Sequence, residues 1–321
     1  MGGSKILKIV LAFWAGVATF ITGFFIWDNL KPKNENVIPI AMALDDGYLY
    51  PTIVSITSMM ENAEKDTVYN IYIMHPDEFL QESKEKLCSL GAKYKNCNIK
   101  LINMKKEYAG ANETGHITKP AYYRLSLSEL LPSLDKIIWM DGDTLIFDDL
   151  HQMYNLELND NYYLAYLDDK RVVPESLKNF GLRDNEYVCD GVMLVNLKKL
   201  REDDMVPKFK GFIERYNDKL IQHDQTVINA VCYGKIGILP PKFGMFNFRR
   251  NGRMVYEYVD GLTSKNKYDC REMDDAINNL IVLHCVNKPW QDATCSFADT
   301  WWQYAKKTDF YDEICDKYEL F

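Results

Sequence analysis

Short apolar runs alternate with amphipathic segments through the first half of the chain. Each run has the length of a β-strand and stops at turn-forming residues, whereas the segments between the runs repeat apolar residues at helical spacing. The strands predicted in this way span residues 37–44, 69–74, 99–102 and 137–140, and the predicted helices span residues 51–62, 78–90 and 122–131. Gly91 and Pro132 follow two of these helices as stop signals.

The second half of the chain continues the alternation. It predicts strands at residues 162–167, 191–197 and 280–286, helices at 205–216 and 223–231, and an amphipathic terminal helix at 301–321. Strands that alternate with helices indicate an α/β fold with a mostly parallel sheet and helices on both faces. Residues 37–305 contain no linker or shift of composition, so we expect one domain there and a C-terminal helix over residues 306–321.

An apolar segment without charged residues, residues 9–27, precedes this domain. As a helix it would extend over about 28 Å, which is close to the thickness of the hydrocarbon core of a bilayer. It ends in bulky residues instead of a small-residue cleavage site, and Trp14 and Trp27 suit the two membrane interfaces. We therefore expect an uncleaved transmembrane anchor between an N-terminal flank, residues 1–8, and a tether, residues 28–36.

Composition narrows the class of protein. The 321 residues are 47% hydrophobic and carry a formal net charge of -8, which suits a folded protein and argues against a nucleic-acid binder. The eight cysteines show neither zinc-ligand spacing nor a disulfide framework, so we expect free thiols in a reducing compartment. This favours the cytosolic face of a bacterial inner membrane. A Golgi-type luminal orientation stays open, because lysines on the two sides of the anchor nearly balance.

The strand at residues 137–140 ends in Asp141-Gly142-Asp143. Carboxylates at the edge of a core are costly without a cation, and two at this spacing can chelate a hard divalent ion such as Mg²⁺ or Mn²⁺. Strand 37–44 also ends at a carboxylate, Asp45, and open α/β sheets bind ligands at the carboxyl ends of their strands. We therefore expect two acidic clusters on one rim of the sheet. On spacing alone, a turn of two solvated aspartates is the alternative.

Six separated segments, taken in order, resemble the family 8 glycosyltransferases, which include glycogenin and lipopolysaccharide galactosyltransferases and have a GT-A fold. The segments are residues 43–48, 119–125, 135–144, 191–197, 223–225 and 284–290. Each segment is short, but six in the right order make the resemblance specific. It implies a GT-A fold, that is, a Rossmann-like mixed and mostly parallel sheet with helices on both faces. It also implies retaining transfer of a hexose or similar sugar from a UDP-sugar to a glycan, lipopolysaccharide or lipid-linked acceptor, with Mn²⁺ as the metal and Mg²⁺ as the other choice.

The resemblance also implies a role for individual residues. The metal would be held by Asp141, Asp143 and His284, where it would stabilise charge on the departing UDP. The donor would be bound by Ala43, Asp45, Tyr48, Arg124, Gly142, Gly191 and Lys288. The transferred sugar would be surrounded by the candidate catalytic residues Asp190, Asp224 and Gln225, and the acceptor would be faced by Asp168. Because a Gln225 amide is a poor nucleophile, same-face attack is favoured, and double displacement stays open.

The chain departs from the family pattern at two places. The residues before Gly191 are Cys189 and Asp190, where relatives commonly have Asn-Ala or Asn-Ser, so Asp190 adds a charge near the donor sugar. Residues 285–287 alone separate His284 from Lys288, which predicts a tighter loop over the diphosphate. This short loop supports one alternative function, a membrane protein that binds a nucleotide sugar with weak or no catalysis.

A second alternative is a different chemistry with a similar motif. The haloacid-dehalogenase-like phosphatases place Asp-x-Asp-Gly-Thr after an apolar strand, and their first aspartate attacks phosphorus. In this chain Thr144 follows Asp143 directly, and the glycine stands between the aspartates. A long α/β segment also precedes the motif, whereas the phosphatase motif usually lies near the start of its domain.

Overall fold

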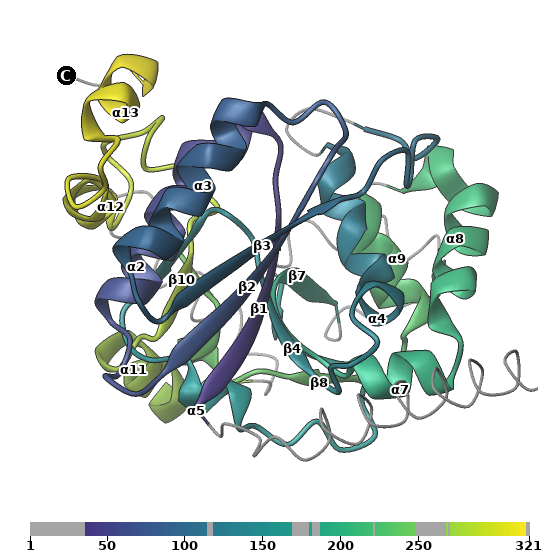
Figure 1. The fold of residues 1–321 in the computed structure, drawn as a ribbon. Coiled ribbons are helices and arrows are strands. Elements are labelled where there is room, and N and C mark those ends of the chain that lie inside the picture. The colour runs from purple at the N-terminus through teal and green to yellow at the C-terminus, as the bar shows by residue number, and fades with distance from the viewer. Residues whose placement is uncertain are drawn as a thin grey trace, which may run out of the picture. The chain divides into compact units, whose positions relative to one another are not determined.

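The central strands are apolar along their length because both faces of the sheet are covered. The computed structural model describes residues 36–113, 118–168, 180–181, 187–220, 222–247, 268 and 270–318. The main sheet has seven strands in the order β3-β2-β1-β4-β7-β6-β8 (Figure 1). Their bounds are β1 (Val37–Ala43), β2 (Val68–His75), β3 (Cys97–Asn103), β4 (Ile137–Met140), β6 (Tyr163–Leu167), β7 (Val188–Val195) and β8 (Ile236–Ile238).

One strand of this sheet, β7, runs antiparallel to its neighbours, whereas the other pairs described are parallel. β1 runs parallel to β4, and β2 runs parallel to β3. β7 is antiparallel to both of its neighbours, β4 and β6, and β8 is parallel to β6. The predicted α/β fold with a mixed sheet is therefore confirmed. Since β4 and β6 are both antiparallel to the strand between them, the carboxyl ends of β1, β4 and β6 lie at one edge.

A smaller sheet adjoins that edge. It has the order β5-β10-β9, with β5 (Thr144–Ile146), β9 (Met245–Phe246) and β10 (Val282–His284). β5 begins directly after the turn that follows β4, so the chain passes from one sheet to the other at Asp141-Gly142-Asp143. β10 pairs antiparallel with β5 and places His284 opposite Thr144. Residues far apart in the sequence are thereby joined at the turn.

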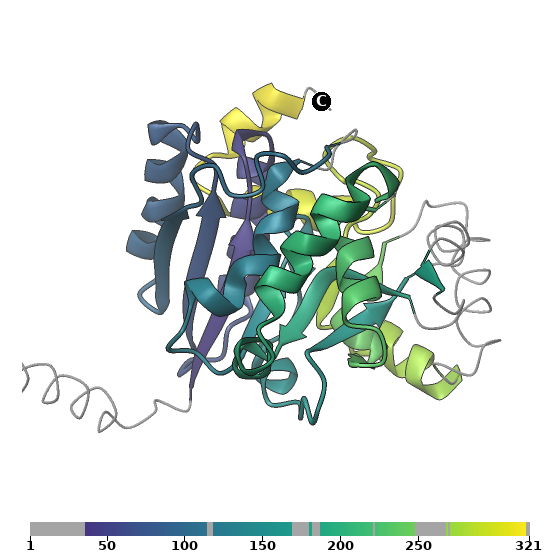
Figure 2. The same ribbon diagram turned by 90° about the vertical axis from the view of Figure 1, so that its right-hand side faces the viewer.

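Helices cover both faces of the main sheet, as the alternation predicts. One face is covered by α2 (Leu49–Glu61) and α3 (Gln81–Lys93), and α12 (Ala298–Ala305) and α13 (Tyr311–Tyr318) lie outside these two helices on the same side, as Figure 1 shows. The other face is covered by α4 (Leu127–Leu130), α7 (Leu197–Glu202), α8 (Met205–Tyr216) and α9 (His223–Val231), of which α8 and α9 lie in front of the sheet in Figure 2. The remaining short elements are α5 (His151–Tyr154), α11 (Cys270–Asn278), η1 (Asp46–Tyr48), η2 (Lys119–Ser126), η3 (Asn217–Lys219) and η4 (Pro241–Phe243).

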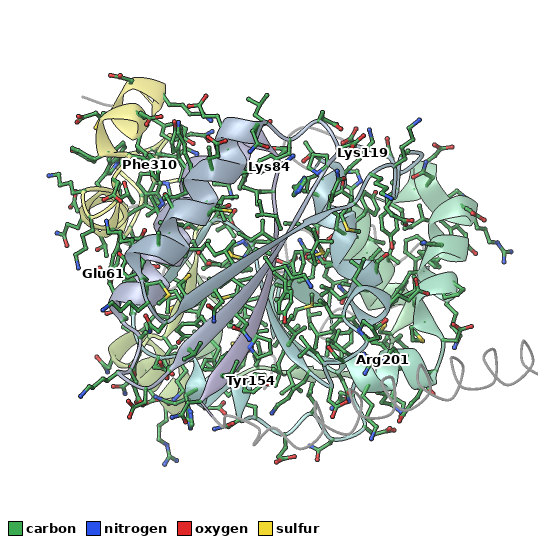
Figure 3. The ribbon with its side chains drawn as sticks, viewed as in Figure 1. Glu61, Lys84, Lys119, Tyr154, Arg201 and Phe310 are labelled. Carbon is green, nitrogen blue, oxygen red and sulfur yellow. The ribbon has the colours of Figure 1, made fainter. Side chains whose placement is uncertain are left out.

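The two layers of helices enclose two hydrophobic cores, and side chains fill both layers (Figure 3). β4 contributes to both cores because successive side chains of a strand point to opposite faces. Ile138 and Met140 join the core under α2 and α3, whereas Ile137 and Trp139 join the core that includes residues of α8 and α9. The strand that ends at the two aspartates is therefore held from both sides.

The helix predicted at 122–131 is a 3-10 helix through Ser126 and α-helical only over Leu127–Leu130, and two other helices end differently from the prediction. α3 continues through Gly91 to Lys93. A Cβ at Gly91 would lie 3.2 Å from the carbonyl oxygen of Cys97, so this glycine serves close packing against β3 rather than the end of the helix. The terminal helix predicted at 301–321 is divided into α12 and α13, because the Thr308 hydroxyl donates to the carbonyl of Ala305 and competes with helical bonding there.

The cysteines and the membrane segment complete the comparison with the sequence. Seven cysteines have described side chains, and all seven are free thiols, as expected. The anchor predicted at residues 9–27 lies outside the described residues. Within the described ranges, no helix is long and apolar enough to cross a bilayer.

A substitution at Ile138 measures how much the burial of the central strand β4 contributes to stability. Its side chain is 0% exposed, and its register partners are Ile40 in β1 and Leu194 in β7. We expect Ile138→Ala to lower the free energy of unfolding by about 2–5 kcal/mol, through lost burial and a residual cavity, in urea denaturation followed by circular dichroism. The control Leu80→Ala, at a residue 58% exposed, should change it by less than about 0.5 kcal/mol. Equal effects of the two substitutions would contradict this picture of the core.

Candidate active site

A polar stripe on α2 holds the turn after β4. The stripe has helical spacing and consists of three fully buried residues, Thr52, Ser55 and Ser58. Ser55 Oγ lies 2.8 Å from Thr144 Oγ1, and the Thr144 hydroxyl donates to the carbonyl of Asp141. Ser58 Oγ accepts the backbone N–H of Ile146 in β5. The stripe therefore sets the path of the chain between the two sheets, and with it the direction of the two carboxylates.

Two glycines allow other groups to approach this turn closely. A Cβ at Gly142 would lie 2.2 Å from Thr52 Oγ1, so α2 could not pack against the turn if residue 142 had a side chain. A Cβ at Gly191 would lie 2.3 Å from His284 Cε1 and 3.0 Å from Asp141 Oδ2. Both positions need glycine because a side chain would collide with its neighbours, and not because the backbone there has a positive φ.

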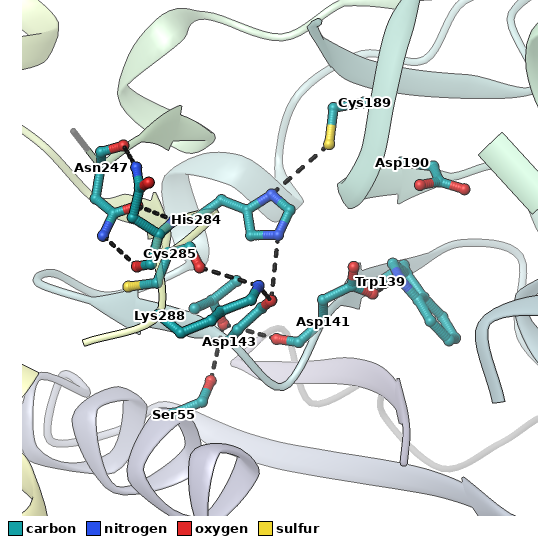
Figure 4. Close-up of polar contacts among 12 residues, drawn as sticks. Ser55, Trp139, Asp141, Asp143, Cys189, Asp190, Asn247, His284, Cys285 and Lys288 are labelled. Atoms are coloured by element: carbon teal, nitrogen blue, oxygen red, sulfur yellow. Dashed lines mark hydrogen bonds and ion pairs between the residues drawn. The ribbon is translucent and has the colours of Figure 1, made fainter. Parts of the chain in front are cut away.

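Asp143 contacts the side chains of both His284 and Lys288 (Figure 4). His284 Nε2 lies 3.1 Å from Asp143 Oδ1, and Lys288 Nζ forms an ion pair with Asp143 Oδ2. Lys288 also donates to the carbonyl of Cys285 at 3.1 Å, so the short connection after His284 still brings this ammonium to the turn. One ligand atom from each of Asp141, Asp143 and His284 lies within 4.8 Å of the others.

Arg124, from η2, forms the second charged centre. Its guanidinium is 5% exposed and contacts carboxylates from three elements. Nη2 donates to Asp141 Oδ1 at 2.8 Å, Nη1 lies 3.1 Å from Asp190 Oδ1, and Nε lies 2.8 Å from Asp224 Oδ2. Trp139 Nε1 also donates to Asp141 Oδ1, at 2.9 Å. Asp141 Oδ1 is therefore fully engaged, and Oδ2 is the oxygen beside Gly191 and His284.

The two carboxylates of the turn have different electrostatic surroundings. Burial raises the pKa of Asp141 above its usual range, and the positive charge of Arg124 opposes this only in part. Burial would also raise the pKa of Asp143, but the charges of Lys288 and His284 hold it well below its usual range. For His284, the carboxylate of Asp143 outweighs burial and raises the pKa. Asp143 is thus kept ionised by direct cationic partners.

An irregularity in β7 brings Asp190 and Gly191 to the cluster. Along β6, the pairing partner changes from Met193 opposite Ala165 to Cys189 opposite Tyr166, so residues 190–192 bulge out of the ladder. Bulges of this kind re-aim side chains next to functional sites. The backbone N–H of Asp141 donates to the carbonyl of Gly191 at 2.8 Å, which joins the bulge to the turn.

A further polar pair lies at the ends of β6 and α9. Gln225 Nε2 donates to Asp168 Oδ2 at 2.6 Å, and both side chains are half-buried. The neighbouring Asp224 is buried, and burial together with the nearby Asp190 raises its pKa well above the usual range. The structure therefore brings together the residues expected at the transferred sugar and the residue expected at the acceptor.

The residues expected at the nucleotide lie at the carboxyl end of β1. Ala43 is the last residue of the strand and is half-buried. Asp45 accepts from the backbone N–H of Gly47 at 2.9 Å and from Thr118 Oγ1 at 2.8 Å. Tyr48 turns toward the charged cluster, with the Lys288 ammonium 6.0 Å from the centroid of its ring. Tyr48 is therefore the link between this edge and Asp143.

Three residues of the site were not found by sequence reasoning. Ser55 contacts Thr144 at the turn, Trp139 donates to Asp141, and Cys189 Sγ lies 3.6 Å from His284 Nδ1. A metal-binding histidine commonly has a partner on its other ring nitrogen, usually an oxygen, and here the thiol of Cys189 lies at that nitrogen. The spacing of Thr52, Ser55 and Ser58 on one face of a mostly apolar helix was the available signal for the first of them.

Arg124→Ala should be strongly destabilising, because it leaves carboxylates buried without a partner. We expect the free energy of unfolding at pH 7 to fall by about 3–5 kcal/mol. The loss should be smaller at pH 5. Without the guanidinium, the buried carboxyl groups have higher pKa values in the folded state than in the unfolded state, so the stability of the variant decreases as pH rises. Urea denaturation at the two pH values measures this. Arg201→Ala, which removes a partly exposed guanidinium bonded to backbone carbonyls, is the control, and an equal pH dependence there would contradict the explanation.

Known proteins resemble the chain over most of its length. Lipopolysaccharide 1,2-glucosyltransferase of Escherichia coli is 26% identical over 272 residues, which cover 82% of this chain and 76% of the relative. General stress protein A of Bacillus subtilis is 23% identical over 285 residues, which cover 86% and 96%. A solved structure of the galactosyltransferase LgtC, in complex with donor and acceptor sugar analogues, matches with a TM-score of 0.71 at 25% identity and covers 85% of this chain and 96% of that one.

The family itself is recognised from the sequence. The model described as "Glycosyl transferase family 8" matches residues 39–294, which include most of β1, the turn after β4, the β7 bulge and the segment from His284 to Lys288. The match agrees with the resemblance carried by the six segments and with the mixed sheet of the fold. This chain therefore belongs to glycosyl transferase family 8.

Proposed function

We propose that this glycosyltransferase is a metal-dependent, retaining enzyme that moves a hexose or similar sugar from a UDP-sugar to a glycan or lipid-linked acceptor. The observation that carries the proposal is the grouping of Asp141, Asp143 and His284 beside Lys288, at the edge where three strands end. This grouping offers oxygen and nitrogen ligands for a cation, next to the Lys288 ammonium as a positive charge for phosphates. Residues 9–27 would anchor the enzyme at a membrane, with the cytosolic face of a bacterial inner membrane favoured.

The residues of the cluster fit a hard divalent cation. Among the described residues, Asp143 Oδ1 is buried and without a regular hydrogen bond, and its polar neighbour is His284 Nε2, 3.1 Å away. Two carboxylates and one imidazole, without a thiolate among them, suit Mn²⁺, with Mg²⁺ as the other choice. Bound there, the cation would act as a Lewis acid that stabilises negative charge on the departing UDP.

The surrounding side chains can perform the remaining tasks. Lys288 is held at the edge of the cluster, where its ammonium can attract the diphosphate of the donor. Arg124 holds Asp190 and Asp224 together, so that their carboxyl groups can accept hydrogen bonds from sugar hydroxyls and steady a positively charged sugar. Gln225, bonded to Asp168, lies between the expected donor and acceptor sides. An amide in that place favours same-face attack over a covalent intermediate.

The two alternatives find less support. A phosphatase would need the first aspartate of the motif as a nucleophile, but Asp141 Oδ1 is occupied by Arg124 and Trp139. A protein that binds nucleotide sugars without turnover was suggested by the short loop after His284. The ion pair of Lys288 with Asp143 shows that the loop is long enough to bring this cation to the turn.

Calorimetric titration and a hydrolysis panel test the proposed function together. UDP should bind to the full-length protein when Mn²⁺ is present and much more weakly without it, and one UDP-sugar of a panel should be hydrolysed slowly to UDP and free sugar. Asp143→Asn should reduce that hydrolysis by at least about 100-fold, because it removes a charge from the cation site. Asp148→Asn, at an exposed carboxylate in the next segment, is the matched control. Metal-independent UDP binding without any turnover would contradict the proposal.

Gly191→Ala tests the cation site without reference to catalysis. The new methyl group would collide with the His284 ring and should displace it from Asp143, so we expect Mn²⁺ affinity to fall by about tenfold or more in titrations followed by electron paramagnetic resonance. Gly211→Ala, on α8, has no neighbouring atom within 4 Å of the added Cβ and should leave Mn²⁺ affinity unchanged. Equal Mn²⁺ binding by the two variants would show that His284 is not a ligand.

A further inference from the structure

The last helix of the chain packs against the segment that carries Lys288. The family match ends at residue 294, so α12 and α13 lie beyond it. Their aromatic side chains nevertheless meet the candidate donor site in an aromatic cluster, which consists of Tyr48, Trp290, Trp301 and Tyr318. The cluster joins η1 to both terminal helices, and Trp290 contacts each of the other three members.

One side of the cluster bounds the position of Lys288. The Lys288 ammonium lies 6.0 Å from the ring centroid of Tyr48 and 6.0 Å from that of Trp290. These two rings meet edge to face, with centroids 6.2 Å apart and an interplanar angle of 86°. A lysine has a flexible four-carbon stem, so these two rings add to the contacts with Asp143 and Cys285 that fix the place of the charge. The position of the Trp290 indole is therefore also a constraint on the ammonium.

The opposite side of the cluster fixes Trp290. Its indole is 4% exposed and has its centroid 5.3 Å from that of Trp301 and 6.1 Å from that of Tyr318. Trp301 and Tyr318 are themselves in contact, with centroids 6.4 Å apart. Aromatic pairs at these distances stabilise their arrangement beyond the burial of their surface. Without the Tyr318 ring, Trp290 would lose one of the walls that hold it toward Lys288.

α13 is itself fixed to the elements around the nucleotide edge. Glu313 accepts a hydrogen bond from Tyr50 in α2 at 2.7 Å and forms an ion pair with Lys86 in α3. Lys317 Nζ donates to the carbonyl of Asp46, the first residue of η1, at 3.3 Å. Contacts with α2, α3 and η1 therefore fix α13 next to the expected donor site, and with it the position of Tyr318.

We propose that Tyr318 is a positioning residue which, through Trp290, holds the Lys288 ammonium in place for the diphosphate of the donor. The inference rests on the proposed function, in which Lys288 attracts that diphosphate. The Tyr318 hydroxyl is buried and has no hydrogen-bond partner among the described residues, so we assign the role to the ring. α13 thereby completes the donor site from outside the region matched by the family.

Titration of full-length variants with UDP in the presence of Mn²⁺ tests this role. Tyr318→Ala should weaken UDP affinity by about tenfold, the scale of one aromatic contact, whereas Tyr318→Phe keeps the ring and should stay within about twofold of the wild type. Tyr311→Ala removes another aromatic ring from α13, one that lies outside the aromatic cluster, and should also stay within about twofold. Circular dichroism of each variant verifies that the fold is retained.

A double-mutant cycle separates positioning from general packing. In a Lys288→Ala background, Tyr318→Ala should have no further effect on UDP affinity, because the residue through which it acts is already absent. An undiminished effect in that background, or an unchanged UDP affinity of Tyr318→Ala alone, would overturn this inference and leave the proposed function standing. If the wild-type protein binds no UDP with Mn²⁺, the proposed function fails, and this inference fails with it.

Discussion

One buried guanidinium is the interaction on which the site depends. Arg124 meets Asp141 at the end of β4, Asp190 in the β7 bulge and Asp224 at the start of α9. Isolated carboxylates would be too costly to bury there, and an arginine cannot lose its charge under any ordinary condition. Its rigid fork of donors also fixes angles, which a lysine would not do. Three separate elements are thereby brought together around one side chain, which also stacks on Trp139 with its Cζ 4.4 Å from the ring centroid.

The second constraint is the passage between two sheets. The turn after β4 has to leave the main sheet, enter β5 and present two carboxylates within three residues. The hydroxyls of α2 make this possible, because they replace the ladder bonds that the turn interrupts. β10 then pairs with β5 and supplies His284 from the far end of the domain. A cation site assembled in this way belongs to the fold as a whole, since no local segment contains its three ligands.

Much of this arrangement could be predicted from the sequence, and the exceptions have physical reasons. The apolar runs predicted the strands, and the Asp-Gly-Asp motif and Asp45 were placed at one edge because parallel strands end together. The direction of β7 was not predicted, because a strand buried on both faces has the same apolar pattern whether it runs parallel or antiparallel. Contacts such as Cys189 with His284 were also missed, since they depend on a bulge that leaves no periodic signal. Gly91 was read as a helix end, although its small size serves packing between elements.

The crowding at Gly142 and Gly191 has a consequence for how such a site can diversify. At these two positions any side chain would overlap α2 or the His284 ring, so a substitution of either glycine during evolution would disrupt the site. Cys189 and Asp190 directly precede Gly191, and their side chains contact His284 and Arg124 respectively. Substitutions at these two positions can alter the chemistry of the site while the backbone around it keeps its structure. The Cys189-Asp190 pair of this chain is one such combination of side chains.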